Sequence, residues 1–213
     1  MKTDDLISML ANGVPAVESN TMRRRYALAL GWGAFGTLLM MTIWLGVRRD
    51  IAAAALLPMF WVKAAFPAAL LASALVAAFR LSRPGGRLGH VVLAMAGVVL
   101  TIWFLAAVEL LVAAPDVRNN LVLGISWNVC SFYISTLSVP ALVAALWAMQ
   151  GLAPTRPILA GAASGLLAGA LGALVYSLHC PEMAAPFIAI WYLLGMLIPA
   201  VLGAIAGFWL LRW

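Results

Sequence analysis

The 213-residue chain is 65% hydrophobic and only 9% charged, and its mean hydropathy is +1.05. A soluble domain is about half apolar and a quarter charged, so this composition excludes a soluble globular protein and indicates an integral membrane protein. The net charge of +6 does not indicate nucleic-acid binding, because membrane proteins concentrate arginine and lysine in their cytoplasmic loops.

Residues 1–25 form the one stretch that is both polar enough and long enough to act in water. We expect a short amphipathic helix there, because two acidic residues suit the first turn of a helix and three apolar residues then share one face. These residues are Asp4, Asp5, Leu6, Ile7 and Leu10. A helix of about ten residues is marginal in water, so we expect it to be loose until it binds a partner. The alternative is a disordered tail that precedes a membrane anchor.

Six apolar segments follow, and each has about the 20 residues that a helix needs to cross a bilayer. They cover approximately residues 27–47, 57–79, 91–113, 129–149, 158–178 and 185–211. The first resembles a signal peptide, but it is longer than a signal core and no small-residue cleavage site follows, so we interpret it as an uncleaved anchor. The expected fold class is all-α: a polytopic membrane protein with a cytoplasmic segment (1–25) and a six-helix transmembrane bundle (26–213).

The basic residues predict the orientation of this bundle. If the N-terminus is cytoplasmic, nine of the 13 lysines and arginines fall in cytoplasmic segments, three fall in outer loops, and Lys63 lies within a span. The reverse orientation would invert the usual positive-inside bias. We therefore place both termini in the cytoplasm.

The fifth apolar segment carries small residues at every fourth position, at Gly161, Gly165 and Gly169, and Gly203 and Gly207 repeat the pattern in the sixth. Small residues at this spacing let another helix approach closely. We expect this face to pack inside the bundle rather than at a dimer interface.

Lys63 and Glu109 are the two ionisable residues expected inside the membrane, where such residues are costly and often functional. At ~1.5 Å per residue, Lys63 lies about 25 Å from Arg80 and Glu109 about 28 Å from His90, so both are near the outer interface. We predict an ion pair between Lys63 and Glu109. The alternative is that Lys63 snorkels to the interface alone.

The two cysteines are placed at a similar depth. At ~1.5 Å per residue, Cys130 and Cys180 lie about 30 and 35 Å from the inner ends of neighbouring helices, near an oxidising periplasm. They form either a redox pair, structural cysteines or part of a soft-metal site. The candidate metal ligands are Cys130, His179, Cys180 and Glu182. No hydrolytic triad, phosphate loop or nucleotide-binding motif is found, so we do not expect an enzyme.

Four stretches, in this order, resemble one protein family. They are Met1-Lys-Thr-Asp-Asp-Leu6, Leu57-Pro-Met-Phe-Trp-Val-Lys63-Ala-Ala-Phe-Pro67, Gly151-Leu-Ala-Pro-Thr-Arg156, and His179-Cys-Pro-Glu182 with Trp191-Tyr192. Nearly end to end, the chain resembles the NrsF family, the six-span inner-membrane negative regulators of extracytoplasmic-function sigma factor F in proteobacteria.

The resemblance implies an anti-sigma factor that holds its sigma factor at the bacterial inner membrane until oxidative or heavy-metal stress arrives. The family's cysteine pair falls on Cys130 and Cys180, although Ser131 stands where the family often has proline. The sigma factor would bind to the short helix through Asp4 and Asp5 in its first turn and through the face formed by Leu6, Ile7 and Leu10. The implied partners are a sigma factor and the bilayer, without direct contact to nucleic acid. No cofactor is implied beyond a soft metal ion as a signal, and the oligomeric state stays open. The alternatives are a small-molecule transporter or channel and a membrane thiol-redox protein.

Overall fold

The computed structural model describes residues 3–12, 21–83, 85–152 and 154–212, and these residues contain helices and no strand. Within them, six helical segments are long and apolar enough to cross a membrane, which confirms the predicted six-helix, all-α fold. The main helices are α1 (Thr3–Asn12), α2 (Thr21–Trp44), α4 (Pro58–Leu81), α5 (His90–Val112), α9 (Pro157–Tyr176) and α11 (Leu193–Leu210).

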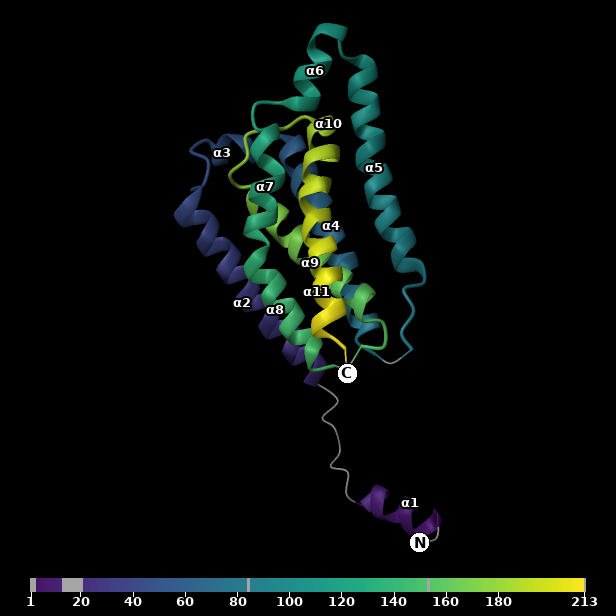
Figure 1. Cartoon of the computed structure of the whole chain (residues 1–213). Helices are drawn as coiled ribbons and strands as arrows, with labels where there is room; N and C mark the ends of the chain where they lie inside the picture. Colours follow the sequence, from purple (N-terminus) through teal and green to yellow (C-terminus); the bar gives the residue numbers. More distant parts are fainter. Residues whose placement is uncertain (1–2, 13–20, 84, 153, 213) are drawn as a thin grey trace.

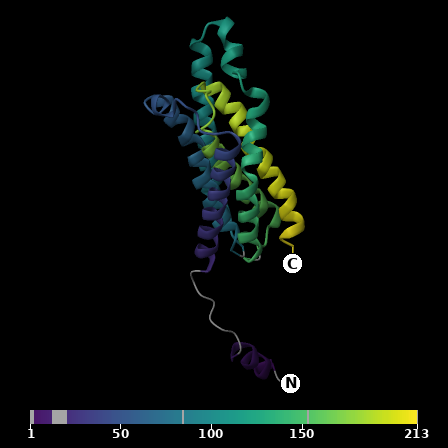
Figure 2. The ribbon, with the colours of Figure 1, turned by 90° about the vertical axis from the view of Figure 1, so that its left-hand side faces the viewer.

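The six spans form one elongated bundle, and α1 lies apart from it in two perpendicular views (Figures 1 and 2). The C-terminus and the start of α2 lie at the same end of the bundle, as an even number of spans requires. We call this the terminal end. The opposite end carries α6 (Pro115–Leu123) and the short helices α3 (Ile51–Ala54) and α10 (Ala185–Phe187).

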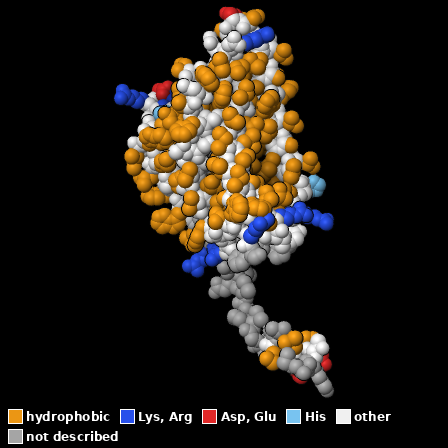
Figure 3. Space-filling view, viewed as in Figure 1, with side chains coloured by type: hydrophobic (Ala, Val, Ile, Leu, Met, Phe, Trp, Pro, Cys, Tyr) orange, Lys and Arg blue, Asp and Glu red, His pale blue; other side chains and the backbone are white. Residues whose placement is uncertain are grey.

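The surface between the two ends suits a lipid environment. Figure 3 shows apolar side chains over most of the visible face of the bundle, while lysine and arginine gather at its ends. The exposed apolar residues include bulky side chains on each of the outer helices, such as Trp32, Trp103, Phe132 and Trp209. Exposed apolar surface of this extent is expected where the neighbour is lipid rather than water.

The fourth span differs from the single helix expected over residues 129–149. It consists of α6, α7 (Trp127–Leu137) and α8 (Val139–Gln150). Pro140 lies in the first turn of α8, where its missing N–H group interrupts the hydrogen-bond ladder from α7. The helix α6 was not expected; it begins at Pro115 and ends before Gly124, whose φ of +57° favours glycine.

The helix α9 is the centre of the bundle, and most of its residues are buried. A Cβ atom added at Gly161 or Gly165 would overlap backbone atoms of α11, and one added at Gly203 would overlap Gly161. The two glycine faces therefore pack against each other at backbone contact distance. The predicted use of these glycines inside the bundle is confirmed.

Candidate functional site

The sulfur atoms of Cys130 and Cys180 meet in the core of the bundle, near the end opposite the termini. Cys130 lies in the first turn of α7, and Cys180 lies in the segment 177–184 between α9 and α10, which we call the thiol loop. Both residues are 0% exposed and free, and their thiols interact directly with each other. The structure thus brings the two cysteines together, but it places them deeper than the open rim that the sequence indicated.

Lys63 reaches the same place from α4 and is completely buried. Its Nζ atom donates hydrogen bonds to the backbone oxygens of Cys180 at 2.6 Å and Glu182 at 2.8 Å. The ammonium also lies 5.5 Å from the ring centre of Tyr192, within cation–π range. Lys63 therefore fastens the thiol loop to α4.

The predicted ion pair between Lys63 and Glu109 is wrong. The Glu109 carboxylate accepts a hydrogen bond from the backbone N–H of Ala185 at 2.8 Å, and the one salt bridge among the described residues joins Arg48 to Asp50. Ala185 begins α10, and the unpaired N–H groups of a helix start attract a carboxylate. Two loop carbonyls, and not Glu109, accept the hydrogen bonds of Lys63.

Glu182 fastens the thiol loop to a third place, the turn between α6 and α7. Its Oε1 atom accepts a hydrogen bond from the backbone N–H of Ile125 at 2.7 Å. The neighbouring Gly124 leaves the space for this carboxylate, because a Cβ atom there would lie 2.7 Å from the Glu182 carboxyl carbon. The loop is thus held by α4 and by the α6–α7 turn, and α5 holds the start of α10 directly after it.

The segment after α2 holds the loop as well. The backbone N–H of Arg48 donates a hydrogen bond to the backbone oxygen of Leu178 at 3.2 Å. The Nη1 atom of the Arg48 side chain donates a second one to the backbone oxygen of Cys180 at 3.4 Å. The imidazole Nδ1 of His179 lies 2.8 Å from the backbone oxygen of Gly46. In the sequence, Arg48 is one of the three basic residues in the outer loops. The two-residue spacing between Arg48 and Asp50 suggests a local ion pair, but no sequence signal links Arg48 to Cys180.

The four candidate metal ligands do not assemble. No group of three or more His, Cys, Asp or Glu side chains that could hold a metal ion occurs in the part of the chain that the structure describes. His179 is turned to Gly46 and Glu182 to Ile125, so only the two cysteines remain together. The predicted metal site of Cys130, His179, Cys180 and Glu182 is therefore corrected to a two-thiol site.

Cys180 and Asp50, which both lie outside the spans, have lowered pKa values. Hydrogen bonding from the Cys130 thiol and the charge of Lys63 hold the pKa of the Cys180 thiol below its ordinary value, against the opposing effect of burial. Two hydrogen bonds from the Arg48 guanidinium, 2.7 and 2.6 Å long, lower the pKa of the Asp50 carboxyl. Because its pKa is lowered, the Cys180 thiol favours the thiolate form more than a free cysteine does.

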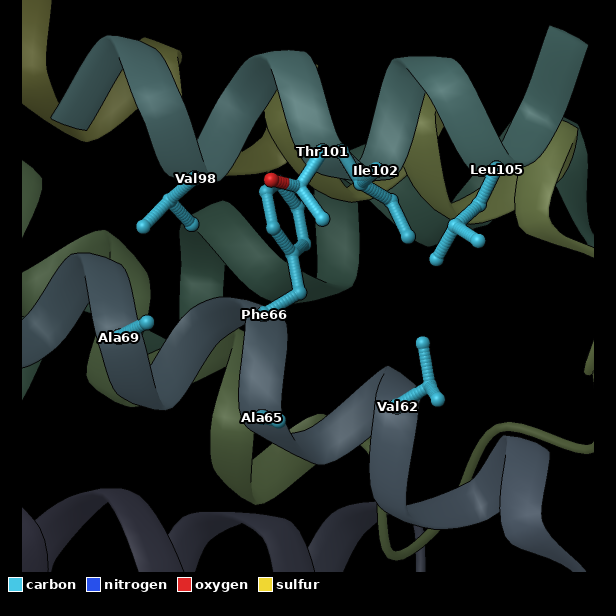
Figure 4. A pocket seen from close by; sticks show the side chains of 8 residues that line it. All are labelled: Val62, Ala65, Phe66, Ala69, Val98, Thr101, Ile102 and Leu105. Carbon is cyan, nitrogen blue, oxygen red and sulfur yellow. The ribbon is translucent and has the colours of Figure 1, made fainter. Parts of the chain in front are cut away.

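An apolar pocket of about 320 Å³ opens between α4 and α5 (Figure 4). Phe66 and Ile102 line it and also belong to the core cluster that contains both cysteines. Thr101 is its single polar lining residue, and the Thr101 hydroxyl donates to the Gly97 oxygen of its own helix at 2.8 Å. The pocket therefore offers no charged group to an ionic substrate.

The second candidate site is α1, which forms over Thr3–Asn12 with Asp4 and Asp5 in its first turn, as the sequence predicted. Leu6 and Ile7 are 42% and 58% exposed, and Met9 beside them is 69% exposed. The side chain of Leu10 lies outside the described part of the chain. The predicted apolar face therefore presents at least Leu6 and Ile7 to its surroundings.

Comparison with known proteins decides the family. The family model of NrsF, described as negative regulator of sigma F, matches residues 10–213. The chain belongs to the NrsF family. It is 54% identical to the probable anti-sigma-F factor NrsF of Azospira oryzae and 44% identical to the anti-sigma-F factor NrsF of Caulobacter vibrioides, with all of each chain covered. No solved structure matches.

Membership in this family confirms two predictions made from the sequence. The resemblance to NrsF proteins is shown by the family match and by both relatives. The chain is also a regulatory protein rather than an enzyme, because the family is one of negative regulators.

Proposed function

We propose that the chain is an anti-sigma factor that holds an extracytoplasmic-function sigma factor at the bacterial inner membrane through α1. Oxidative or heavy-metal stress, sensed through Cys130 and Cys180, then releases the sigma factor. Both relatives are named as anti-sigma-F factors, which supports the first part. The direct interaction of two free thiols in one buried core supports the second.

The observation that carries sigma binding is the exposed apolar face of α1. Leu6, Ile7 and Met9 are all exposed, and the helix lies apart from the bundle (Figure 1). A short amphipathic helix of this kind binds a partner by laying its apolar face in a groove. Ordering it costs about 1–2 kcal/mol per residue in backbone entropy, so a small change in the bound state suffices for release.

The positive-inside rule supports a cytoplasmic position for α1. The start of α2 and the connections α4–α5 and α8–α9 lie at the terminal end (Figure 1), and they carry exposed arginines, including Arg24, Arg83, Arg87 and Arg156. Cytoplasmic loops of inner-membrane proteins carry such an excess of positive charge. With the terminal end in the cytoplasm, the thiol loop faces the periplasmic side, where disulfides form and persist.

Oxidation would change the contacts that the thiol loop makes. When the two thiols form a disulfide, they give up two protons and two electrons to the oxidant, and Cys180 is drawn to α7 by a covalent bond. The loop also bonds to α4 and the α6–α7 turn, α5 bonds to Ala185 directly after the loop, and the loop begins where α9 ends. A shift at Cys180 therefore acts on the helix at the centre of the bundle.

A capture assay tests this function. The native sigma factor is incubated with the detergent-solubilised full-length protein, before and after oxidation. We expect capture by the reduced protein, loss of capture in Leu6→Asp/Ile7→Asp, and capture that resists oxidant in Cys130→Ser/Cys180→Ser. Ser8→Asp adds one charge to an exposed position on the polar side of α1 and is the matched control.

Two results would contradict the proposed function in different ways. Absence of capture by the reduced wild-type protein removes the anti-sigma role. Equal release from wild type and from the double serine variant leaves that role intact and removes the cysteines as sensors.

A further inference from the structure

Lys63 is a buried cation for which the structure supplies no anion. Its Nζ atom is held by the oxygens of Cys180 and Glu182, which carry partial charges only. Among the described residues, the carboxylates of Glu109 and Glu182 bond to backbone N–H groups instead, and Arg48 next to the loop is also positive. A buried charge without a counter-charge is strongly disfavoured, so an anion within its surroundings would stabilise the ammonium.

The Tyr192 hydroxyl lies in the same place. It is buried, has no nitrogen or oxygen partner among the described residues, and interacts directly with Cys180. Buried hydroxyl groups nearly always find an acceptor, because an unmade hydrogen bond away from water is costly. A thiolate at Cys180 would supply both the missing negative charge and a strong acceptor.

We propose that in the reduced protein Cys180 is a thiolate whose counter-ion is the Lys63 ammonium, so that Cys180 reacts first with an oxidant and Cys130 completes the disulfide. Lys63 is then a positioning residue that selects one of two buried cysteines. The lowered pKa of Cys180 agrees with this assignment. The proposal rests on the redox part of the proposed function and names the order of its steps.

The chemistry balances with hydrogen peroxide as the oxidant. The Cys180 thiolate attacks one peroxide oxygen, a sulfur–oxygen bond forms, the oxygen–oxygen bond breaks, and hydroxide leaves. The Cys130 thiol then attacks the sulfenic sulfur, the disulfide forms, and the hydroxyl group departs as water with the proton of Cys130. Two sulfur atoms lose two electrons in total, and the peroxide gains them.

The groups that act on Cys180 come from every element around it. Lys63 comes from α4, Cys130 from α7, Tyr176 from α9, Tyr192 from the π-helical turn Ile188–Tyr192, and Arg48 from the segment after α2. Of these, Lys63 and Arg48 are positive. Arg48 already pairs with Asp50, at 2.6 Å. Lys63 is therefore the cation available to the thiolate.

The test follows thiolate absorbance in the ultraviolet while the reduced full-length protein in detergent is titrated with acid. In wild type and Cys130→Ser we expect one thiolate at neutral pH, and in Cys180→Ser none. Lys63→Met should shift the half-titration point upward by about one pH unit or more, which is a tenfold or larger fall in the thiolate-to-thiol ratio at a given pH. Lys63→Arg should restore it, whereas a purely structural role of Lys63 would not move this spectroscopic signal.

A second measurement treats Cys130→Ser with hydrogen peroxide and traps sulfenic acid with a dione reagent, with Cys180→Ser as the matched control. We expect the adduct on Cys180, formed at least about tenfold faster than on Cys130, the ratio for one pKa unit. Thiolate absorbance that survives in Cys180→Ser, or faster labelling of Cys130, overturns the proposal even if Lys63→Met does not fold. A normal thiolate signal without oxidant-induced release of the sigma factor would leave the ion pair standing and remove only the sensing role.

Discussion

Replacing Gly169 by alanine should destabilise the bundle, because the added methyl group has no space. An ideal Cβ atom at Gly169 would lie 2.7 Å from the Met196 oxygen and 2.9 Å from its Cα atom, both on the backbone of α11. Real side chains do not approach a backbone so closely, and a backbone cannot turn away as a flexible side chain does. One of the two helices must therefore shift by several tenths of an ångström. Overpacking of this kind costs about 1–3 kcal/mol.

Gly97→Ala in α5 is the matched control for this change. Gly97 is exposed, and no atom lies within 4 Å of the position of its added Cβ. Alanine itself favours a helix over glycine by about 1 kcal/mol, and this gain is common to both variants. The difference between the free energies of unfolding of the two variants therefore isolates the steric cost. We expect Gly169→Ala to be less stable than Gly97→Ala by about 1–3 kcal/mol.

The assay is equilibrium unfolding of both variants in mixed detergent micelles, followed by tryptophan fluorescence. A Gly169→Ala protein as stable as Gly97→Ala would refute the close packing of α9 on α11. A loss confined to Gly169→Ala would support it.

Three further predictions concern single hydrogen-bonded groups. Glu109→Ala should lower the free energy of unfolding by about 1–3 kcal/mol, because it leaves the Ala185 N–H without its acceptor; Glu109→Gln keeps an acceptor and should lose less, and equal losses would contradict this role. Tyr26→Phe should cost about 1 kcal/mol, since it removes the hydroxyl bonded to Ser82 at 2.9 Å; no change in the same unfolding assay would count against that bond. The lowered pKa of Asp50 means that its pairing with Arg48 stabilises the fold above the ordinary carboxyl pKa and stops doing so as the pH falls through the lowered value. Melting temperatures of wild type and Asp50→Asn should therefore converge in acid, and a constant difference would contradict the pairing.

The spans and their packing faces could be predicted because their signals are local. An apolar run of about 20 residues identifies a span, and glycines at every fourth position identify a face, whatever lies across it. For the same reason α1 could be placed within residues 1–25 from its acidic first turn and its apolar spacing. The fragment α6 was missed because its run of nine residues is too short and too polar to resemble a span, although Pro115 and Gly124 mark its two ends.

The partners of the charged groups could not be predicted, because residue counting gives depth in the membrane but not direction around a helix. The sequence places Lys63 and Glu109 at a similar depth. In the structure both form hydrogen bonds with backbone atoms of one continuous segment, the thiol loop and the start of α10. Backbone carbonyl and N–H groups are present at every residue, so the sequence cannot show which of them will be free. The same limit applies to His179, whose partner is the Gly46 oxygen rather than a metal ion.

The glycine packing also bears on how a signal could cross the bundle under the proposed function. A helix that contacts its neighbours through long side chains can absorb a small displacement by changes of rotamer. Gly161 and Gly165 instead place the backbone of α9 against that of α11, and Gly172 does the same against α7, the helix that carries Cys130. Cys180 lies three residues beyond the C-cap of α9. A displacement at Cys180 would therefore pass along α9 towards the terminal end, because no long side chains at these glycine contacts can absorb it by changing rotamer. If Gly169→Ala loosens this packing without unfolding the protein, oxidation should release the sigma factor less completely, whereas undiminished release would place the signal path outside α9.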